Sequence, residues 1–205
     1  GDVDHIGQLE EDLADLISAH RMADQKVILL GHSSGGGLVV RFAGGEYGDM
    51  IDGAVLLAPF LKHNAPTTKA NSGGWAHVLM RRIIGLSMLN NIGIHVLDYL
   101  PMIQFTMPDA VLNGPMGHTA TLAYSWRLNT SYGPRGDYLK DVAALPDFLL
   151  VAGRADESFV AEGYEPLMSD VTDKGRFLLL DGVSHLDVVG DVATEAAIRG
   201  FVNEF

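Results

Sequence analysis

A serine flanked by glycines is the first group in this sequence that could do chemistry. Residues 31–35 read GHSSG, after the apolar run 27–30 and before an apolar helical pattern that starts at Leu38. A strand, a sharp turn and a helix in that order expose the hydroxyl of the central serine, where it can attack a carbonyl carbon. The two flanking glycines leave space for the turn. The pattern predicts Ser33 as a nucleophile, with the backbone N–H of Ser34 at the helix start as an oxyanion donor.

Two further residues could complete a catalytic set with this serine. Asp156 follows the apolar run 147–152, and His185 follows the run 176–180. A serine hydroxyl needs a neutral imidazole to take its proton, and the imidazole needs a carboxylate to fix its tautomer. Residues that follow parallel strands meet at one edge of the sheet. The order Ser…Asp…His therefore predicts Ser33 as nucleophile, Asp156 as acid and His185 as general base.

Other readings of the same stretches are weaker. Glu157 is the nearest rival carboxylate, but it lies one residue further on and would aim elsewhere. His32 lies inside the turn and is expected to be a packing residue. A phosphate-binding loop would need a lysine followed by Ser or Thr at its end, which this glycine-rich turn lacks.

Four apolar runs predict the sheet that must position these residues. They are bounded by glycine, proline and aspartate and alternate with helical patterns, which is typical of a parallel α/β sheet flanked by helices. The predicted strands are 27–30, 51–58, 147–152 and 176–180. Helical periodicity predicts helices over residues 6–20, 157–168 and 187–205.

Between residues 60 and 138 the alternation of strands and helices stops. This segment is rich in methionine, leucine, isoleucine and aromatic residues, and prolines and glycines break it into short pieces. Helical spacing over residues 75–89 predicts at least one helix. So long an interruption favours an insertion. We expect a core of residues 1–59 and 139–205 with a helical lid of residues 60–138, whose apolar side chains form lid core, line a substrate site, or do both.

The composition excludes several classes of function. A formal net charge of −12 disfavours nucleic acid, because few side chains could neutralise phosphates. Without cysteine there is no disulfide or thiolate chemistry, and the histidines show no metal-ligand spacing, so no metal and no cofactor are predicted. Apolar residues make up 47% of the chain, yet no apolar run approaches the ~18 residues of a membrane span. The compartment stays open between cytoplasmic and exported.

The chain resembles the α/β-hydrolase superfamily, within it the lid-bearing lysophospholipase and monoacylglycerol-lipase-like group related to serine aminopeptidases. The resemblance rests on residues 31–35 for the nucleophile, 153–156 for the acid and 182–185 for the base, with 60–138 as the lid. It implies a serine hydrolase that cleaves a carboxylic ester with an apolar acyl group through an acyl-enzyme. An aminopeptidase or amidase of the same fold is the alternative, and a catalytically inactive binding module is another.

The resemblance also implies parts that this sequence does not contain. Sheets of the family have further strands upstream of the nucleophile strand, together with a loop that carries the second oxyanion N–H. The sequence holds the last four strands only, and it starts at Gly1 without methionine. Strand 27–30 would have a bare apolar edge, which is an aggregation liability. We therefore expect an upstream N-terminal segment of the same protein to pair with residues 27–30 and to complete the oxyanion hole.

Overall fold

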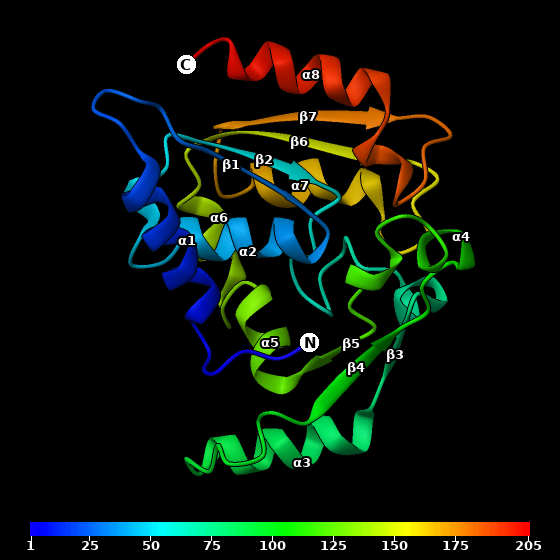
Figure 1. The fold of residues 1–205 in the computed structure, drawn as a ribbon. Coiled ribbons are helices and arrows are strands. Elements are labelled where there is room, and N and C mark those ends of the chain that lie inside the picture. Colours follow the sequence, from blue (N-terminus) through cyan, green and yellow to red (C-terminus); the bar gives the residue numbers. More distant parts are fainter.

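A four-stranded parallel sheet lies at the centre of the molecule (Figure 1). The computed structural model describes residues 1–70 and 73–205 with their side chains, and residues 71 and 72 by their backbone alone. In spatial order the strands are β1 (Ile28–His32), β2 (Gly53–Leu57), β6 (Asp147–Gly153) and β7 (Gly175–Leu180). The pairing is parallel throughout, so all four strands end at the same edge. The predicted α/β sheet and its four strands are confirmed, with boundaries shifted by up to two residues.

The two inner strands carry the core. Every residue of β2 is buried, and so is every residue of β6 except Asp147. Strands that are apolar on both faces need helices on both faces, because a parallel sheet connects its strands through helical crossovers.

Helices cover both faces of this sheet. Figure 1 shows α8 (Val192–Val202) on one face and α2 (Ser34–Ala43), α6 (Tyr138–Ala143) and α7 (Tyr164–Ser169) on the other. The helix α1 (Gln8–His20) packs against α2 and α5 (Trp126–Tyr132). Short 3₁₀ turns occupy Gly48–Met50, Ala70–Gly74, Gly117–Thr119, Ala161–Gly163 and Asp187–Val189.

Two predicted helices are shorter than expected. Residues 157–160 are not helical, because the Asp156 carboxylate takes the N–H groups of Ser158 and Phe159; only the turn Ala161–Gly163 and α7 remain. The last helix starts at Val192 rather than at residue 187. The Asp191 side chain caps its start by accepting a hydrogen bond from the Ala193 N–H at 2.8 Å.

A buried ionic cluster holds α1 and α6 against α2, the helix that follows the nucleophile. Glu10 of α1 accepts hydrogen bonds from Arg41 of α2 and from Arg135. Arg135 also pairs with Asp141 of α6, with 3.0 Å between Nη1 and Oδ1. Removing one partner of such a cluster leaves a buried charge uncompensated, so the cluster fixes the position of α2.

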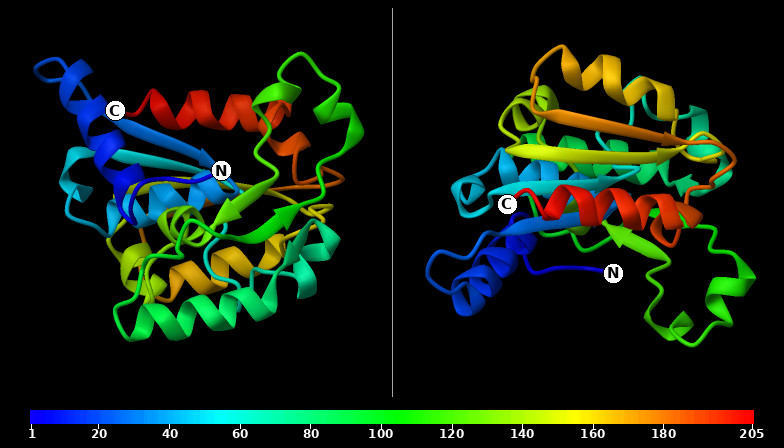
Figure 2. Two further views of the ribbon diagram at one scale, coloured as in Figure 1. Left: turned by 60° about the horizontal axis from the view of Figure 1, so that its bottom comes forward. Right: turned by 90° about the horizontal axis from the view of Figure 1, so that it is seen from above.

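The inserted segment is not only helical, and here the expectation of a helical lid needs correction. It contains a second, antiparallel sheet in the order β3 (Ala76–Val78), β4 (Pro101–Phe105) and β5 (Ala123–Ser125). The helix expected within residues 75–89 is α3 (Met80–Asn91), which starts only after β3. The segment around α4 (Asp109–Leu112) projects from the body of the molecule in both views of Figure 2. Residues 76–78 and 123–125 form strands because β4 pairs with both of them.

One edge of the main sheet is open. β1 pairs with β2 on one side, and among the described residues no strand pairs with its other side. Leu30 in this strand is 52% exposed. The expected upstream segment that would cover this edge stays a prediction. In the part of the chain that the structure describes, no helix combines the length and apolar character needed to cross a membrane.

Candidate active site

The turn between β1 and α2 places Ser33 in a strained backbone conformation. Its φ is 54° and its ψ is −117°, a region that residues other than glycine rarely adopt. Gly31 makes the turn possible, because a Cβ there would lie 2.3 Å from the carbonyl oxygen of Gly35. Such a turn lifts the Ser33 side chain away from the strand and the helix.

The second flanking glycine has a different role from the one the sequence suggested. A Cβ at Gly35 would meet nothing within 4 Å. The crowded positions are the next two: a Cβ would lie 2.8 Å from the Pro59 Cβ at Gly36 and 2.6 Å from the Phe60 carbonyl oxygen at Gly37. These two glycines let α2 pack closely against the segment that follows β2.

The loop after β6 holds the predicted acid. Asp156 is 1% exposed, and its Oδ1 accepts the N–H groups of Ser158 at 2.7 Å and Phe159 at 2.8 Å. Burial raises the pKa of this carboxyl, but hydrogen bonds from His185 and from the two N–H groups outweigh burial and leave the pKa below its ordinary value. Asp156 is therefore a carboxylate at neutral pH, with Oδ2 left to accept from His185.

The structure brings the three predicted residues into one hydrogen-bonded line. The Nδ1 atom of His185 lies 2.7 Å from Oδ2 of Asp156, and its Nε2 lies 3.0 Å from Oγ of Ser33. The His185 ring is buried, with 2% of the residue exposed. A carboxylate on Nδ1 favours the tautomer with its proton there, which leaves Nε2 free to accept the serine proton.

Two more side chains hold the backbone of His185, and sequence reasoning missed both. Glu157 Oε2 accepts the His185 N–H at 3.0 Å. His32 Nε2 lies 2.8 Å from the His185 carbonyl oxygen, to which it donates. Burial is the main cause that lowers the pKa of His32 to about 4, so its ring is neutral at physiological pH. The peptide groups on both sides of the base are thus fixed, and Glu157 contacts the backbone of His185 rather than its ring.

The N-terminus of α2 faces the nucleophile. Ser34 is the first residue of this helix, and the first N–H groups of a helix have no acceptor within it. These N–H groups carry partial positive charge, which favours an anion there. The Ser34 N–H therefore lies at the positive end of α2, next to Ser33, and its role as an oxyanion donor stays a prediction.

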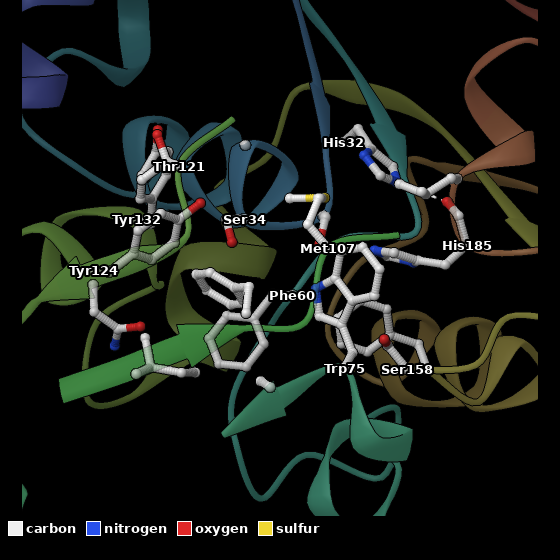
Figure 3. Close-up of a pocket in the computed structure, with 18 residues that line it drawn as sticks. His32, Ser34, Phe60, Trp75, Met107, Thr121, Tyr124, Tyr132, Ser158 and His185 are labelled. Atoms are coloured by element: carbon white, nitrogen blue, oxygen red, sulfur yellow. Dashed lines mark hydrogen bonds between the residues drawn. The ribbon is translucent and has the colours of Figure 1, made fainter. Parts of the chain in front are cut away.

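A cavity of about 370 Å³ opens beside Ser33 and His185 (Figure 3). The rings of Trp75 and Phe159 meet the His185 ring edge-on, with centroid distances of 5.9 and 5.2 Å. Phe60, Phe105 and other apolar side chains form much of the remaining wall. Among the residues that the structure describes, none that lines this cavity is Asp, Glu, Lys or Arg.

Most of the wall that sequence reasoning did not assign comes from the inserted segment 60–138, for which we keep the name lid. Trp75 precedes β3, Ile103 and Phe105 lie in β4, and Tyr124 lies in β5. The apolar character of the segment suggested a substrate-lining role as one alternative, but no pattern singled out these residues. Within the described part of the chain, no group of three or more His, Asp or Glu side chains could hold a metal ion.

Comparisons with known structures agree with the observed fold. The chain is similar to a monoacylglycerol lipase from Paleococcus ferrophilus, with 20% identity and a TM-score of 0.63 over 97% of this chain and 74% of that one. A thermophilic esterase from Thermogutta terrifontis is 18% identical, with a TM-score of 0.59 over 98% and 73%. A soluble variant of the Saccharomyces cerevisiae monoglyceride lipase is 18% identical, with a TM-score of 0.60 over 88% and 60%.

At these identities the structures establish the fold alone, and the family comes from the sequence itself. No curated protein matches the chain. The model of the family described as "Serine aminopeptidase, S33" matches residues 1–186, which is most of the chain. By its sequence, its sheet and the turn that carries Ser33, this chain belongs to the serine aminopeptidase S33 family of α/β-hydrolases.

Proposed function

We propose that this hydrolase cleaves an uncharged carboxylic ester with an apolar acyl group, with Ser33 as nucleophile, His185 as general base and Asp156 as its partner. The observation that carries the proposal is the line of hydrogen bonds from Asp156 to Ser33, which opens into a cavity lined by apolar and uncharged side chains. The similar structures include a monoacylglycerol lipase and an esterase, which supports an ester substrate.

The reaction follows from the positions of these groups. Ser33 Oγ attacks the ester carbonyl carbon while His185 Nε2 takes the hydroxyl proton, and the Ser34 N–H binds the resulting oxyanion. The carbon–oxygen bond to the alcohol then breaks, and His185 gives its proton to the departing alkoxide. Water then attacks the acyl-enzyme in the same way, and His185 takes a proton from the water. The bond between the acyl group and Ser33 Oγ breaks, the acid is released, and His185 returns the proton to Ser33. Asp156 stabilises the imidazolium in both halves of the reaction.

The uncharged cavity argues against the two charged alternatives. An aminopeptidase must bind the ammonium group of its substrate, for which a carboxylate is the usual partner. A phospholipid headgroup needs cationic partners for its phosphate. Neither kind of side chain lines the cavity among the described residues. An inactive binding module is disfavoured because Ser33, His185 and Asp156 are joined by hydrogen bonds in the arrangement that the reaction requires.

Labelling by a fluorophosphonate probe tests the nucleophile. We expect the wild-type protein to be labelled and to hydrolyse p-nitrophenyl butyrate, and the Ser33→Ala variant to lose both activities while keeping its circular dichroism spectrum. Ser18→Ala, at an exposed position of α1, is the matched control and should be labelled like the wild type. Equal labelling of Ser33→Ala and Ser18→Ala would refute the assignment.

We also propose that a further strand of the same protein pairs with the open edge of β1. The exposure of Leu30 in an apolar strand supports this, since an open apolar edge invites aggregation. In the family such a neighbour also brings the second oxyanion N–H. Amide hydrogen exchange of the natural protein tests the pairing: slow exchange at every residue of β1 is expected, and fast exchange at alternate residues would contradict it.

A further inference from the structure

The cavity extends to both sides of Ser34, and the proposed reaction assigns a part of the substrate to each side. His185 must return its proton to the departing alkoxide, so the alcohol part of the ester starts beside its Nε2 atom. The rings of Trp75 and Phe159 flank it there, and the buried Ser158 hydroxyl, which has no hydrogen-bond partner among the described residues, also lines this side of the cavity. The acyl part must extend from the carbonyl carbon in another direction. Figure 3 shows Ser34 between His185 on one side and Tyr124 and Tyr132 on the other.

The end away from His185 is polar, and we call it the polar wall: Ser34, Tyr124, Asn129 and Tyr132. The rings of Tyr124 and Tyr132 stack with 5.1 Å between their centroids. Asn129 and Tyr132 lie three residues apart on α5, so they lie on the same face of that helix. All four residues line the cavity.

The polar wall offers hydrogen bonds that the protein itself does not use. Both residues are half-buried, and in the part of the chain that the structure describes no hydrogen bond joins the Asn129 carboxamide or the Tyr132 hydroxyl to another protein group. Burial raises the pKa of both tyrosines, and the Ser34 hydroxyl offsets this only in part at Tyr124. Both phenols are therefore protonated donors at neutral pH, beside an amide that both donates and accepts.

We propose that the polar wall binds an uncharged carbonyl or hydroxyl group on the acyl part of the substrate, beyond a short apolar stretch. Phe60, Phe105 and Met107 line the apolar stretch. A carboxylate or phosphate is excluded from this end, because burying it without a cationic partner would cost too much. A cavity of about 370 Å³ is at the small end of ligand sites, which limits the acyl group to a short chain. This inference rests on the proposed function.

Two matched esters test the inference: p-nitrophenyl pentanoate and p-nitrophenyl 4-oxopentanoate, which differ by one uncharged carbonyl in the acyl chain. We expect the wild type to favour the oxo ester in kcat/KM by about tenfold, the effect of one or two good hydrogen bonds. Asn129→Leu and Tyr132→Phe should lower this ratio towards one. Each variant is measured with both esters, so a general loss of activity lowers both kcat/KM values and leaves their ratio unchanged.

A matched control variant and a second readout keep the outcomes distinct. Tyr99→Phe makes the same chemical change at an exposed lid position outside the cavity, and it should keep the wild-type ratio. If both esters are hydrolysed with a ratio of one or less, or if Asn129→Leu and Tyr132→Phe leave the ratio unchanged, the polar wall has no such role and the proposed function stands. If neither ester is hydrolysed and the fluorophosphonate does not label Ser33, the proposed function fails and this inference with it.

Discussion

The main sheet and the lid sheet meet at one cavity but contribute different things to it. β2 is buried along its whole length, and the strand order places the ends of β1, β6 and β7 together, so that Ser33, Asp156 and His185 follow from the sheet itself. The lid strands are short and half-exposed, and they contribute wall residues rather than reacting groups. Under the proposed function, the main sheet would determine the rate of the chemical step and the lid would determine which ester fits.

The largest effect is expected at the acid. In Asp156→Asn the amide can donate to Nδ1, which favours the imidazole tautomer that cannot accept the serine proton. We expect kcat to fall by about 10⁴-fold with a small change in KM. Steady-state kinetics on p-nitrophenyl butyrate measure this, and circular dichroism shows whether the loop has kept its fold.

A matched change outside the triad sharpens that result. Glu162→Gln neutralises an exposed carboxylate that pairs with Arg154, and this variant should keep the wild-type kcat. If Asp156→Asn retained more than about a tenth of the wild-type kcat, Asp156 would not be the partner of the base.

A smaller effect is expected where the main sheet fixes the backbone of the base. In Glu157→Ala the His185 N–H loses its acceptor, and we expect kcat to fall about tenfold, as for one lost hydrogen bond. Glu157→Gln keeps an acceptor and should recover most of the loss. The measurement is kcat with a pH profile of kcat/KM for both variants.

The two Glu157 variants separate positioning from charge. Recovery by glutamine means that the hydrogen bond matters. If instead the glutamine and alanine variants lose activity equally and both shift the acid limb of the profile, the negative charge is the important property, and the positioning role is wrong.

The smallest effect is expected in the lid. Phe105 lies on β4 with its ring 4.6 Å from that of Tyr124 in an edge-on contact. Phe105 also lines the cavity, so Phe105→Leu removes part of its apolar wall, and KM for p-nitrophenyl esters should rise a few-fold, more than kcat changes. Val96→Ala, at an exposed lid position, is the control. A fall in kcat larger than the rise in KM would break the division of roles between the two sheets.

The parts predicted from the sequence are those with a local signature. β1, β2, β6 and β7 are continuous apolar runs, and Asp156 and His185 could be proposed because each follows such a run. Parallel pairing then requires the ends of these strands to share one edge, so the triad could be expected without coordinates.

The parts that were missed depend on contacts between distant residues. β3 and β5 have three residues each, too short for a periodic pattern, and they are strands only through their pairing with β4. Glu157 and His32 contact backbone groups of His185. Because nearly every residue has such groups, residue types could not predict these contacts. The importance of Gly36 and Gly37 was missed for a similar reason, since it arises from the segment Pro59–Phe60 packed against them.

The backbone at Ser33 has a consequence for how this chain can change over evolution. Holding a non-glycine residue at this φ destabilises the folded state by about 1–3 kcal/mol, and only glycine would remove this backbone strain. Glycine has no hydroxyl, so the substitution that best suits the turn removes the proposed nucleophile. Selection for a more stable fold therefore favours glycine at this position, whereas selection for the proposed reaction favours serine. Without selection for the proposed reaction, glycine would be the residue that this turn favours.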